Sequence, residues 1–354
     1  MSERVVRSVK SLQISKAFGF PLFFALSLAV MANGCRTATQ VQPPVGPPTS
    51  LPSAGIIGIQ AGVVNGNSGN FFVDFFVVDS NGHAISNLPS NSITIVGPMD
   101  TTFAQLACGN LTSSLFGPYS AELLLDQTGS IRQTDPLNLR LIAAKLFLDA
   151  TKLLPSADEV QLSTFQDSLH DGTYLHSYGP FTHNTSAFED TVETLALKVG
   201  GGTPLYDAMY NETDSLALMG HNTNRALVVF TDGEDNESYM YYPGASLWDA
   251  ITHAVNSNVK IFAIALKTGL DTALISAAMN TGGSVMHTND SRQMVSYFAG
   301  LSNVIRGGVQ YYHSQWHVSL PNSYTLHGQT VSSSLKIKLP DNSTVEAPFS
   351  VTFK

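Results

Sequence analysis

The sequence predicts an α/β domain with a doubly wound, mostly parallel sheet, inserted in or flanked by a β-sandwich that the N- and C-terminal segments form. Between residues 119 and 308, apolar strand-like runs alternate with amphipathic helical segments, as in a largely parallel sheet. On both sides of this region the apolar runs are short and β-rich, with no helical periodicity. The length of 354 residues suits more than one domain.

Residues 1–35 have the pattern of a signal peptide. Four basic residues precede the uncharged run Ala17–Ala32, which is shorter than the roughly 20 residues of a membrane span. The run leads to Asn33-Gly34-Cys35, and this ending resembles a bacterial lipoprotein cleavage box, which makes Cys35 the expected lipid-bearing N-terminus. Such boxes usually carry Leu and a small residue at the positions of Ala32 and Asn33, so ordinary signal cleavage after Ala32 is the alternative. Either route predicts an exported protein of the cell envelope, periplasmic or at the cell surface, and lipidation would anchor it to the membrane.

Two β-rich segments flank the α/β region, and a proline-rich linker at residues 36–54 precedes the first of them. The segment at 55–118 is predicted to contain strands at Ile56–Ile59, Phe71–Val78 and Ser92–Val96, and the segment at 309–354 strands at Val309–Leu320, Ser332–Leu339 and Ala347–Phe353. The second segment is too short for a core of its own. We therefore expect it to pair with the first in one β-sandwich.

The α/β region, residues 119–308, is predicted to alternate strands and helices. The strands are expected at Ala121–Asp126, Val160–Phe165, Thr173–Tyr178, Ala226–Thr231, Val259–Leu266 and Ser284–His287, and the helices at about 133–154, 186–198, 204–217, 245–257, 271–280 and 290–306. Continuous apolar strands such as Leu123-Leu124-Leu125 require helices on both faces of the sheet.

Charge and cysteine content exclude some classes. The formal charge of −9 leaves no electrostatic footprint for nucleic acid. Cys108 is the only cysteine besides Cys35, so a chain acylated at Cys35 has no internal disulfide. No nucleophile elbow, phosphate loop or dinucleotide fingerprint is present in the sequence.

The strongest chemical signal is Asp126-Gln127-Thr128-Gly129-Ser130, directly after a buried strand and before a helix. Ligands of open α/β sheets bind at the carboxyl ends of the strands. Asp126, Thr128 and Ser130 offer a carboxylate and two hydroxyls at alternate positions, which are donors that a hard divalent cation takes. Taken alone, the pattern also suits an ordinary helix cap.

Two later segments strengthen the metal interpretation. Gly201-Gly202-Thr203-Pro204-Leu205-Tyr206-Asp207-Ala208 places Thr203 at a tight turn before a helix. Thr231-Asp232-Gly233-Glu234-Asp235-Asn236 places Asp232 at the end of another buried strand.

These three segments, in this order, resemble the metal-ion-dependent adhesion site of von Willebrand A domains, which have a Rossmann-like fold. The resemblance covers about residues 119–308. It implies that Ser130 and Thr128 bind Mg²⁺, Mn²⁺ or Ca²⁺ through their hydroxyls, that Asp126 and Asp232 act directly or through water, and that Thr203 joins when a ligand engages. Thr128 departs from the serine more usual in the family, but it keeps the hydroxyl. Asp207 and Glu234 are candidates for a supporting shell around these ligands.

The expected function is cation-dependent protein binding rather than catalysis. Two carboxylates balance one dication and leave a coordination position that an Asp or Glu of a partner protein fills in this family. One alternative is a metal-assisted hydrolase with Glu234 as general base, and another is a purely structural envelope lipoprotein. A zinc site from His170, His176 and His183 is not favoured, because their spacing matches no common zinc pattern.

Overall fold

The computed structural model describes residues 50–354 except 98–99, 111–116, 154–156, 168–172, 268 and 322–324. The signal segment, Cys35 and most of the linker lie outside the described residues, so what the sequence indicates about them stays a prediction. Within the described part, no helix combines the length and the apolar character needed to cross a membrane.

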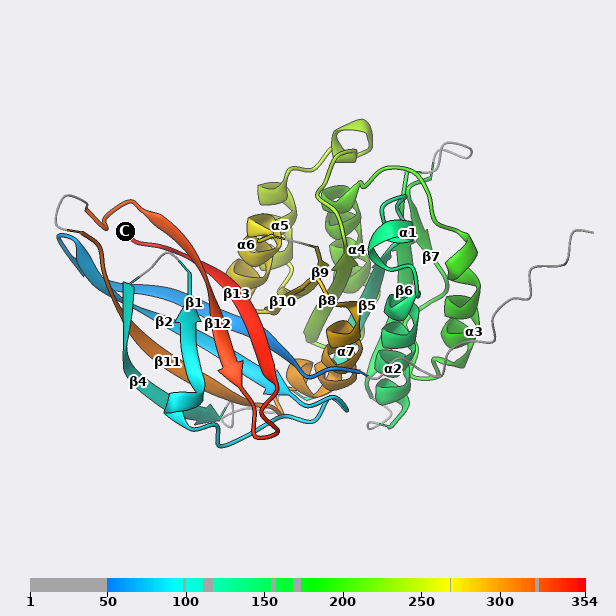
Figure 1. Ribbon diagram of the computed structural model, residues 1–354. Coiled ribbons are helices and arrows are strands. Elements are labelled where there is room, and N and C mark those ends of the chain that lie inside the picture. The colour runs from blue at the N-terminus through cyan, green and yellow to red at the C-terminus, as the bar shows by residue number, and fades with distance from the viewer. Residues whose placement is uncertain are drawn as a thin grey trace, which may run out of the picture. The chain divides into compact units, whose positions relative to one another are not determined.

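The α/β region contains the parallel part of a ten-stranded sheet (Figure 1). Its strands lie in the order β10, β9, β8, β5, β6, β7, and all neighbours are parallel except β6 and β7. They are β5 (Tyr119–Asp126), β6 (Glu159–Phe165), β7 (Leu175–Ser177), β8 (Asn224–Thr231), β9 (Val259–Leu266) and β10 (Ser284–Thr288). Each predicted strand is present within a few residues of its expected bounds.

Helices cover both faces of this sheet (Figure 1). They are α1 (Ile131–Thr134), α2 (Leu139–Leu153), α3 (Ser186–Thr194), α4 (Leu205–Met219), α5 (Leu247–Asn256), α6 (Thr272–Thr281) and α7 (Ser291–Ile305), with short 3₁₀ turns at Ser90–Ser92, Leu195–Leu197 and Ser238–Met240. Helices α2, α3 and α7 pack on one face, and α4, α5 and α6 pack on the other. This arrangement buries Leu123 and Leu124 on opposite sides of β5, as the continuous apolar run requires.

The prediction of one helix over 133–154 is wrong, because two helices occupy this stretch. The short α1 ends at Thr134 and α2 begins at Leu139. Pro136 lies between them; it has no backbone N–H and disfavours helical geometry at the residue before it. The Asp135 carboxylate accepts hydrogen bonds from the N–H groups of Leu139 and Arg140 at 2.8 and 3.0 Å, which satisfies the start of α2.

The terminal segments continue the same sheet and add a second one. Strands β1 (Ser53–Asn65), β2 (Ser68–Val78), β11 (Gln310–Ser319) and β4 (Asp100–Asn110) extend it beyond β10, all antiparallel. A separate antiparallel sheet has the order β13 (Thr344–Thr352), β12 (Thr330–Lys338), β3 (Ile93–Val96). The fold class is therefore confirmed, with one strand, β4, that the sequence did not predict.

The two sheets of the sandwich pack through aromatic side chains. The ring of Phe71 on β2 lies 5.8 Å from that of Phe349 on β13 and 6.1 Å from that of Phe353. The C-terminal strands thus close the core that the N-terminal strands begin, as the predicted pairing of residues 309–354 with residues 55–118 requires.

The sandwich and the α/β region are joined edge to edge. Ile56 of β1 pairs with Val285 of β10. Beside this pair the hydroxyl of Ser296 on α7 donates to the Leu51 carbonyl at 2.6 Å, and the ring of Tyr297 lies 5.5 Å from that of Phe76. The larger sheet of the sandwich is therefore continuous with the parallel sheet, which the strand pattern alone did not indicate.

Candidate functional site

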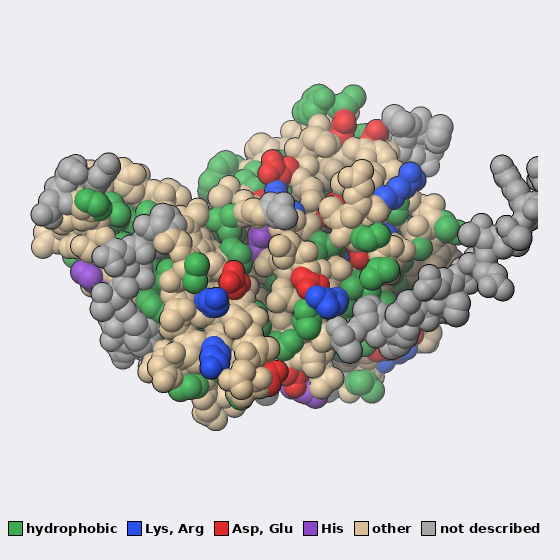
Figure 2. All heavy atoms as spheres, viewed as in Figure 1, with side chains coloured by type: hydrophobic (Ala, Val, Ile, Leu, Met, Phe, Trp, Pro, Cys, Tyr) green, Lys and Arg blue, Asp and Glu red, His purple; other side chains and the backbone are tan. Residues whose placement is uncertain are grey.

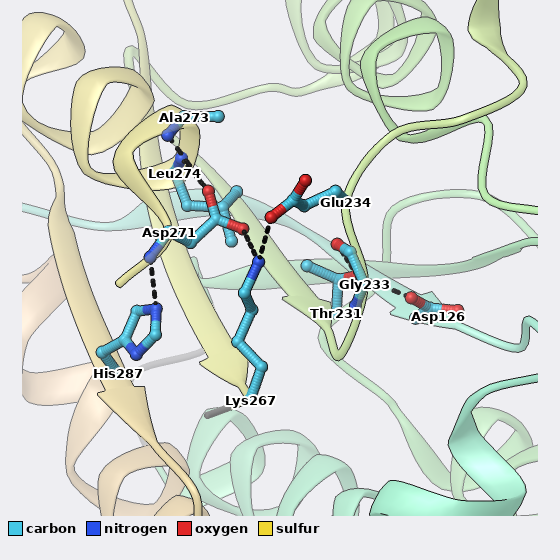
Figure 3. A network of polar contacts seen from close by, with 9 residues as sticks. All are labelled: Asp126, Thr231, Gly233, Glu234, Lys267, Asp271, Ala273, Leu274 and His287. Atoms are coloured by element: carbon cyan, nitrogen blue, oxygen red, sulfur yellow. Dashed lines mark hydrogen bonds and ion pairs between the residues drawn. The ribbon is translucent and has the colours of Figure 1, made fainter. Parts of the chain in front are cut away.

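The first site loop begins where β5 ends, at Asp126. This side chain is fully buried. One carboxylate oxygen, Oδ1, accepts the backbone N–H of Thr128 at 2.7 Å, and the other, Oδ2, accepts the hydroxyl of Thr231 at 2.6 Å. Figure 3 shows Asp126 reaching the end of β8 through Thr231. The carboxylate therefore holds its own loop and the neighbouring strand in one arrangement.

The loops after β5 and β8 meet through Ser130 and Asp232. The Ser130 hydroxyl donates to Asp232 Oδ1 at 2.8 Å and lies 3.2 Å from the hydroxyl of Thr128. The hydroxyl of Thr134 donates to the other Asp232 oxygen. Asp232 is 6 % exposed, so this carboxylate is nearly as buried as Asp126.

The third loop carries Thr203 and depends on glycine. Gly201 has a φ of 75°, and a Cβ at this position would lie 2.0 Å from the carbonyl oxygen of Asp167, so only glycine fits. The Gly201 carbonyl in turn accepts the N–H of Gly129 at 3.1 Å. These contacts fix the loop before α4 against the loop after β5.

Hydrogen bonds from the loop after β8 hold Thr203 close to the other site residues. Its N–H donates to Asn236 Oδ1 at 2.8 Å, and its carbonyl accepts the Asn236 N–H at 3.0 Å. A methyl group built on Gly233 would lie 3.6 Å from Thr203 Oγ1 and 3.9 Å from Ser130 Oγ. The structure thus brings together all five residues that the sequence indicated.

The site concentrates negative charge in a buried position. Burial raises the pKa of Asp126 to about 6, and the nearby Asp232 carboxylate adds to the rise, while hydrogen bonds from Thr231 and Thr128 oppose it. Among the described residues, no lysine, arginine or histidine forms an ion pair with Asp126 or Asp232. A positive charge placed between the two carboxylates would offset their mutual repulsion and the cost of burying them.

The donor set consists entirely of oxygen. Two carboxylates and three hydroxyls point to hard cations such as Mg²⁺, Mn²⁺ and Ca²⁺ rather than to zinc. No cluster of three or more His, Cys, Asp or Glu side chains suited to a metal occurs in the part of the chain that the structure describes.

Comparison with known families places this site in a defined domain. The sequence model of the von Willebrand factor type A domain matches residues 123–299, a stretch that runs from β5 into α7 and contains all five site residues. The chain belongs to the von Willebrand factor type A domain family. No curated protein matches the sequence.

Comparison with solved structures finds similarity to several proteins. A von Willebrand factor type A protein from Catenulispora acidiphila is 12 % identical, with 86 % of this chain and 75 % of that chain covered and a TM-score of 0.41. The pilus adhesin SpaC from Lactobacillus rhamnosus GG is 12 % identical, with 87 % and 49 % covered and a TM-score of 0.44. An aerotolerance-related membrane protein from Bacteroides fragilis is 17 % identical, with 53 % and 98 % covered and a TM-score of 0.39.

Asp207 lies in the first turn of α4, and its carboxylate holds a different segment of the chain. Its carboxylate accepts the N–H groups of Ala245 and Gly244 at 2.5 and 3.3 Å. Asp207 therefore holds the segment between β8 and α5 of the von Willebrand A domain, and does not contact Thr203 directly.

Glu234 lies on the loop after β8, and its carboxylate forms an ion pair with a lysine. It is 78 % exposed, and its carboxylate lies 2.8 Å from Lys267 Nζ, which also contacts Asp271 at 3.2 Å (Figure 3). Asp271 caps α6, and its N–H donates to His287 Nε2 at 2.7 Å. Glu234 thus connects the loop to the ends of β9 and β10.

Three contributing residues were not identified from sequence. Thr231 and Thr134 donate to Asp126 and Asp232, and Asn236 holds Thr203. Thr231 and Asn236 were signalled by their places in the Thr-Asp-Gly-Glu-Asp-Asn segment. The role of Thr134 depends on the short helix α1, which the predicted single helix concealed.

The structure does not bring the described histidines to one point. The His176 ring packs edge-on against Tyr178, with ring centroids 4.5 Å apart, whereas His183 Nδ1 lies 3.0 Å from the Asp158 carbonyl oxygen. His170 lies outside the described residues.

Proposed function

We propose that the von Willebrand A domain holds one divalent cation, Mg²⁺ or its substitutes Mn²⁺ and Ca²⁺, and uses it to bind a partner protein. The ligands would be Asp126, Thr128, Ser130, Thr203 and Asp232. The observation that carries the proposal is the convergence of these side chains from three loops at the carboxyl edge of the sheet.

The chemistry of the site fits a metal-adhesion role. Two carboxylates balance a dication, and hydroxyls complete part of its oxygen shell without adding charge. A cation held in this way keeps one coordination position open for a carboxylate from another protein. An Asp or Glu of the partner is therefore the expected ligand. The charge-assisted contact anchors the complex, and the surrounding surface sets its affinity.

The surface beside the site supports a protein partner. The segment between β8 and α5 exposes Tyr239, Met240 and Tyr242 to 77 %, 63 % and 88 %. Figure 2 shows hydrophobic side chains gathered over this segment at the top of the molecule, next to acidic ones. Tyrosine and methionine are enriched at protein interfaces, so this segment would extend the contact that the cation begins.

Export and a lipid anchor on Cys35 belong to the same proposal. The basic and uncharged run of the leader and the sequence around Cys35 support them. An anchored chain would present the cation site to partners in the periplasm or at the cell surface. Detergent phase partitioning of the mature protein tests this part, because a Cys35→Ser variant should move to the aqueous phase.

Partner binding is tested with an Asp232→Asn variant and a matched control. A pull-down from the envelope fraction with magnesium, compared with chelator, should recover a partner with the wild type only when magnesium is present. Asp232→Asn should lose it, whereas Asp249→Asn, which changes an exposed helix-capping carboxylate, should not. Tyr242→Ser should weaken capture while leaving cation binding unchanged. Capture that persists in Asp232→Asn and in chelator would refute the adhesion site.

No observation favours the metal-assisted hydrolase. It requires a general base beside the cation, and the Glu234 carboxylate is instead exposed and paired with Lys267. A hydrolytic activity that a Glu234→Gln variant lacks would reverse this conclusion. Function insensitive to chelator and to the Asp232 variant would instead favour a purely structural role.

A further inference from the structure

A second group of acidic and hydroxyl side chains lies in the α/β region, under α4; three of its four members are buried, and Ser177 is exposed. Glu122 of β5 and Glu212 of α4 are 0 % and 1 % exposed. Ser163 of β6 and Ser177 of β7 lie between them and the edge of the sheet, and pair with each other across the two strands. Three of the four lie on neighbouring strands of the sheet, and Glu212 lies on α4, which packs on one face of that sheet.

The hydrogen bonds of this group leave Glu122 without a donor. The Ser163 hydroxyl donates to Ser177 Oγ at 2.9 Å, and the Ser177 hydroxyl donates to Glu212 Oε1 at 3.3 Å. Both carboxylate oxygens of Glu122 are buried and have no hydrogen-bond partner. Such orphaned groups are rare in folded proteins and indicate an unseen water, ion or proton.

The Glu212 carboxyl group also interacts electrostatically with Glu122. Burial raises the pKa of Glu122, and the Glu212 carboxylate raises it further; burial likewise raises the pKa of Glu212. The nearby Ser163 hydroxyl lowers the pKa of both carboxyl groups. Within the described residues, neither glutamate has a basic side chain in ion-pair contact. Two buried carboxyl groups in this setting require a shared proton or a cation.

We propose that Glu122 and Glu212 form a second cation site that holds Ca²⁺ with the hydroxyls of Ser163 and Ser177. The donors are all oxygen, which excludes softer metals. Two carboxylates can each bind Ca²⁺ through both oxygens, and Ca²⁺ accepts six to eight ligands in flexible geometry, whereas Mg²⁺ retains several waters. Two bidentate carboxylates and two hydroxyls supply about six oxygens without a shell of waters, so Ca²⁺ is the better fit.

This site is separate from the adhesion site and independent of it. Glu122 and Asp126 are four residues apart on one strand, which corresponds to roughly 13 Å at the rise of a β-strand. Both carboxylates that would hold the ion are buried, so the ion would act within the fold and not as a contact for a partner protein. Its role would be to fasten α4, which begins beside Thr203, to β5, β6 and β7.

The test measures the number of Ca²⁺ ions per chain in the full-length protein by equilibrium dialysis and atomic emission. An Asp126→Asn, Asp232→Asn double variant removes the first site, and we expect it to retain about one Ca²⁺. Adding Glu122→Gln to this background should remove that ion. Adding Glu159→Gln instead should not, because Glu159 is a buried carboxylate on the same sheet with its own donors, Ser120 and His221.

Thermal unfolding gives a second readout. Ca²⁺ should raise the Tm of the Asp126→Asn, Asp232→Asn variant, and this rise should disappear when Glu122→Gln is added. The proposal is overturned if the double variant binds no Ca²⁺. It is equally overturned if Glu122→Gln leaves binding unchanged, which would place the retained ion elsewhere in the chain. Neither outcome bears on partner capture at Asp232, so failure of this site is distinguishable from failure of the adhesion site.

Discussion

Replacing Asp126 with asparagine should make the cation-free protein more stable at neutral pH. The folded protein holds the Asp126 proton up to a pKa of about 6, against 3.8 for the unperturbed group. Because this pKa is raised on folding, the carboxyl favours the folded state at low pH, and that advantage is lost as pH rises through the interval from 3.8 to about 6. Above this interval, ionised Asp126 destabilises the cation-free fold.

The size of the effect follows from the pKa difference. Each pKa unit corresponds to 1.36 kcal/mol, so the full penalty above pH 7 is roughly 3 kcal/mol. Asparagine removes the charge but weakens the hydrogen bond that Asp126 accepts from Thr231, at a cost of about 1 kcal/mol. In chelator, Asp126→Asn should therefore be about 2 kcal/mol more stable than wild type at pH 7.5. The gain should fall to about zero near pH 4.5, where the wild-type carboxyl is protonated in the fold.

Urea unfolding at a series of pH values measures this difference. Midpoints of wild type and Asp126→Asn, followed by circular dichroism in chelator, give the stability gap at each pH. Saturating magnesium should then stabilise the wild type and leave the variant unchanged. A variant that is less stable than wild type at pH 7.5 in chelator, or a gap that is constant with pH, would refute the reasoning from buried charge.

Three other outcomes follow from the packing and the hydrogen bonds. Thr134→Val removes the hydroxyl that donates to Asp232 and should lower Mg²⁺ affinity on the order of ten-fold; unchanged affinity in isothermal titration calorimetry would contradict this role. Phe71→Ala should lower the free energy of unfolding by about 3–5 kcal/mol, because it opens a cavity beside Phe349; a loss under 1 kcal/mol in urea would argue against the packing between the two sheets. A 119–308 fragment should aggregate during size-exclusion chromatography, because removing β1 exposes the edge of β10. A monodisperse fragment with the Tm of the full chain would show that this edge does not need to be covered.

The sequence alone determined the order of the elements and the loops in which site residues occur. Continuous apolar runs such as Ala226–Phe230 favour strands buried on both faces, and amphipathic segments must follow them to cover those faces. The carboxyl ends of parallel strands meet at one edge, so the loops at Asp126, Thr203 and Asp232 could be expected to approach one another. Local pattern sufficed here, because each inference depended on a strand and its own loop.

Tertiary structure decided which strands pair and how polar groups are partnered. An alternating run predicts a strand without naming its neighbour, so neither β4 beside β11 nor β1 beside β10 could be read from their own residues. Donors such as Thr134 and Thr231 reach the site carboxylates only after the loops are assembled. The isolation of Glu122 arises in the same way, since its neighbours come from β6, β7 and α4. Contacts between distant segments depend on the whole packed chain, and periodicity within a segment carries no record of them.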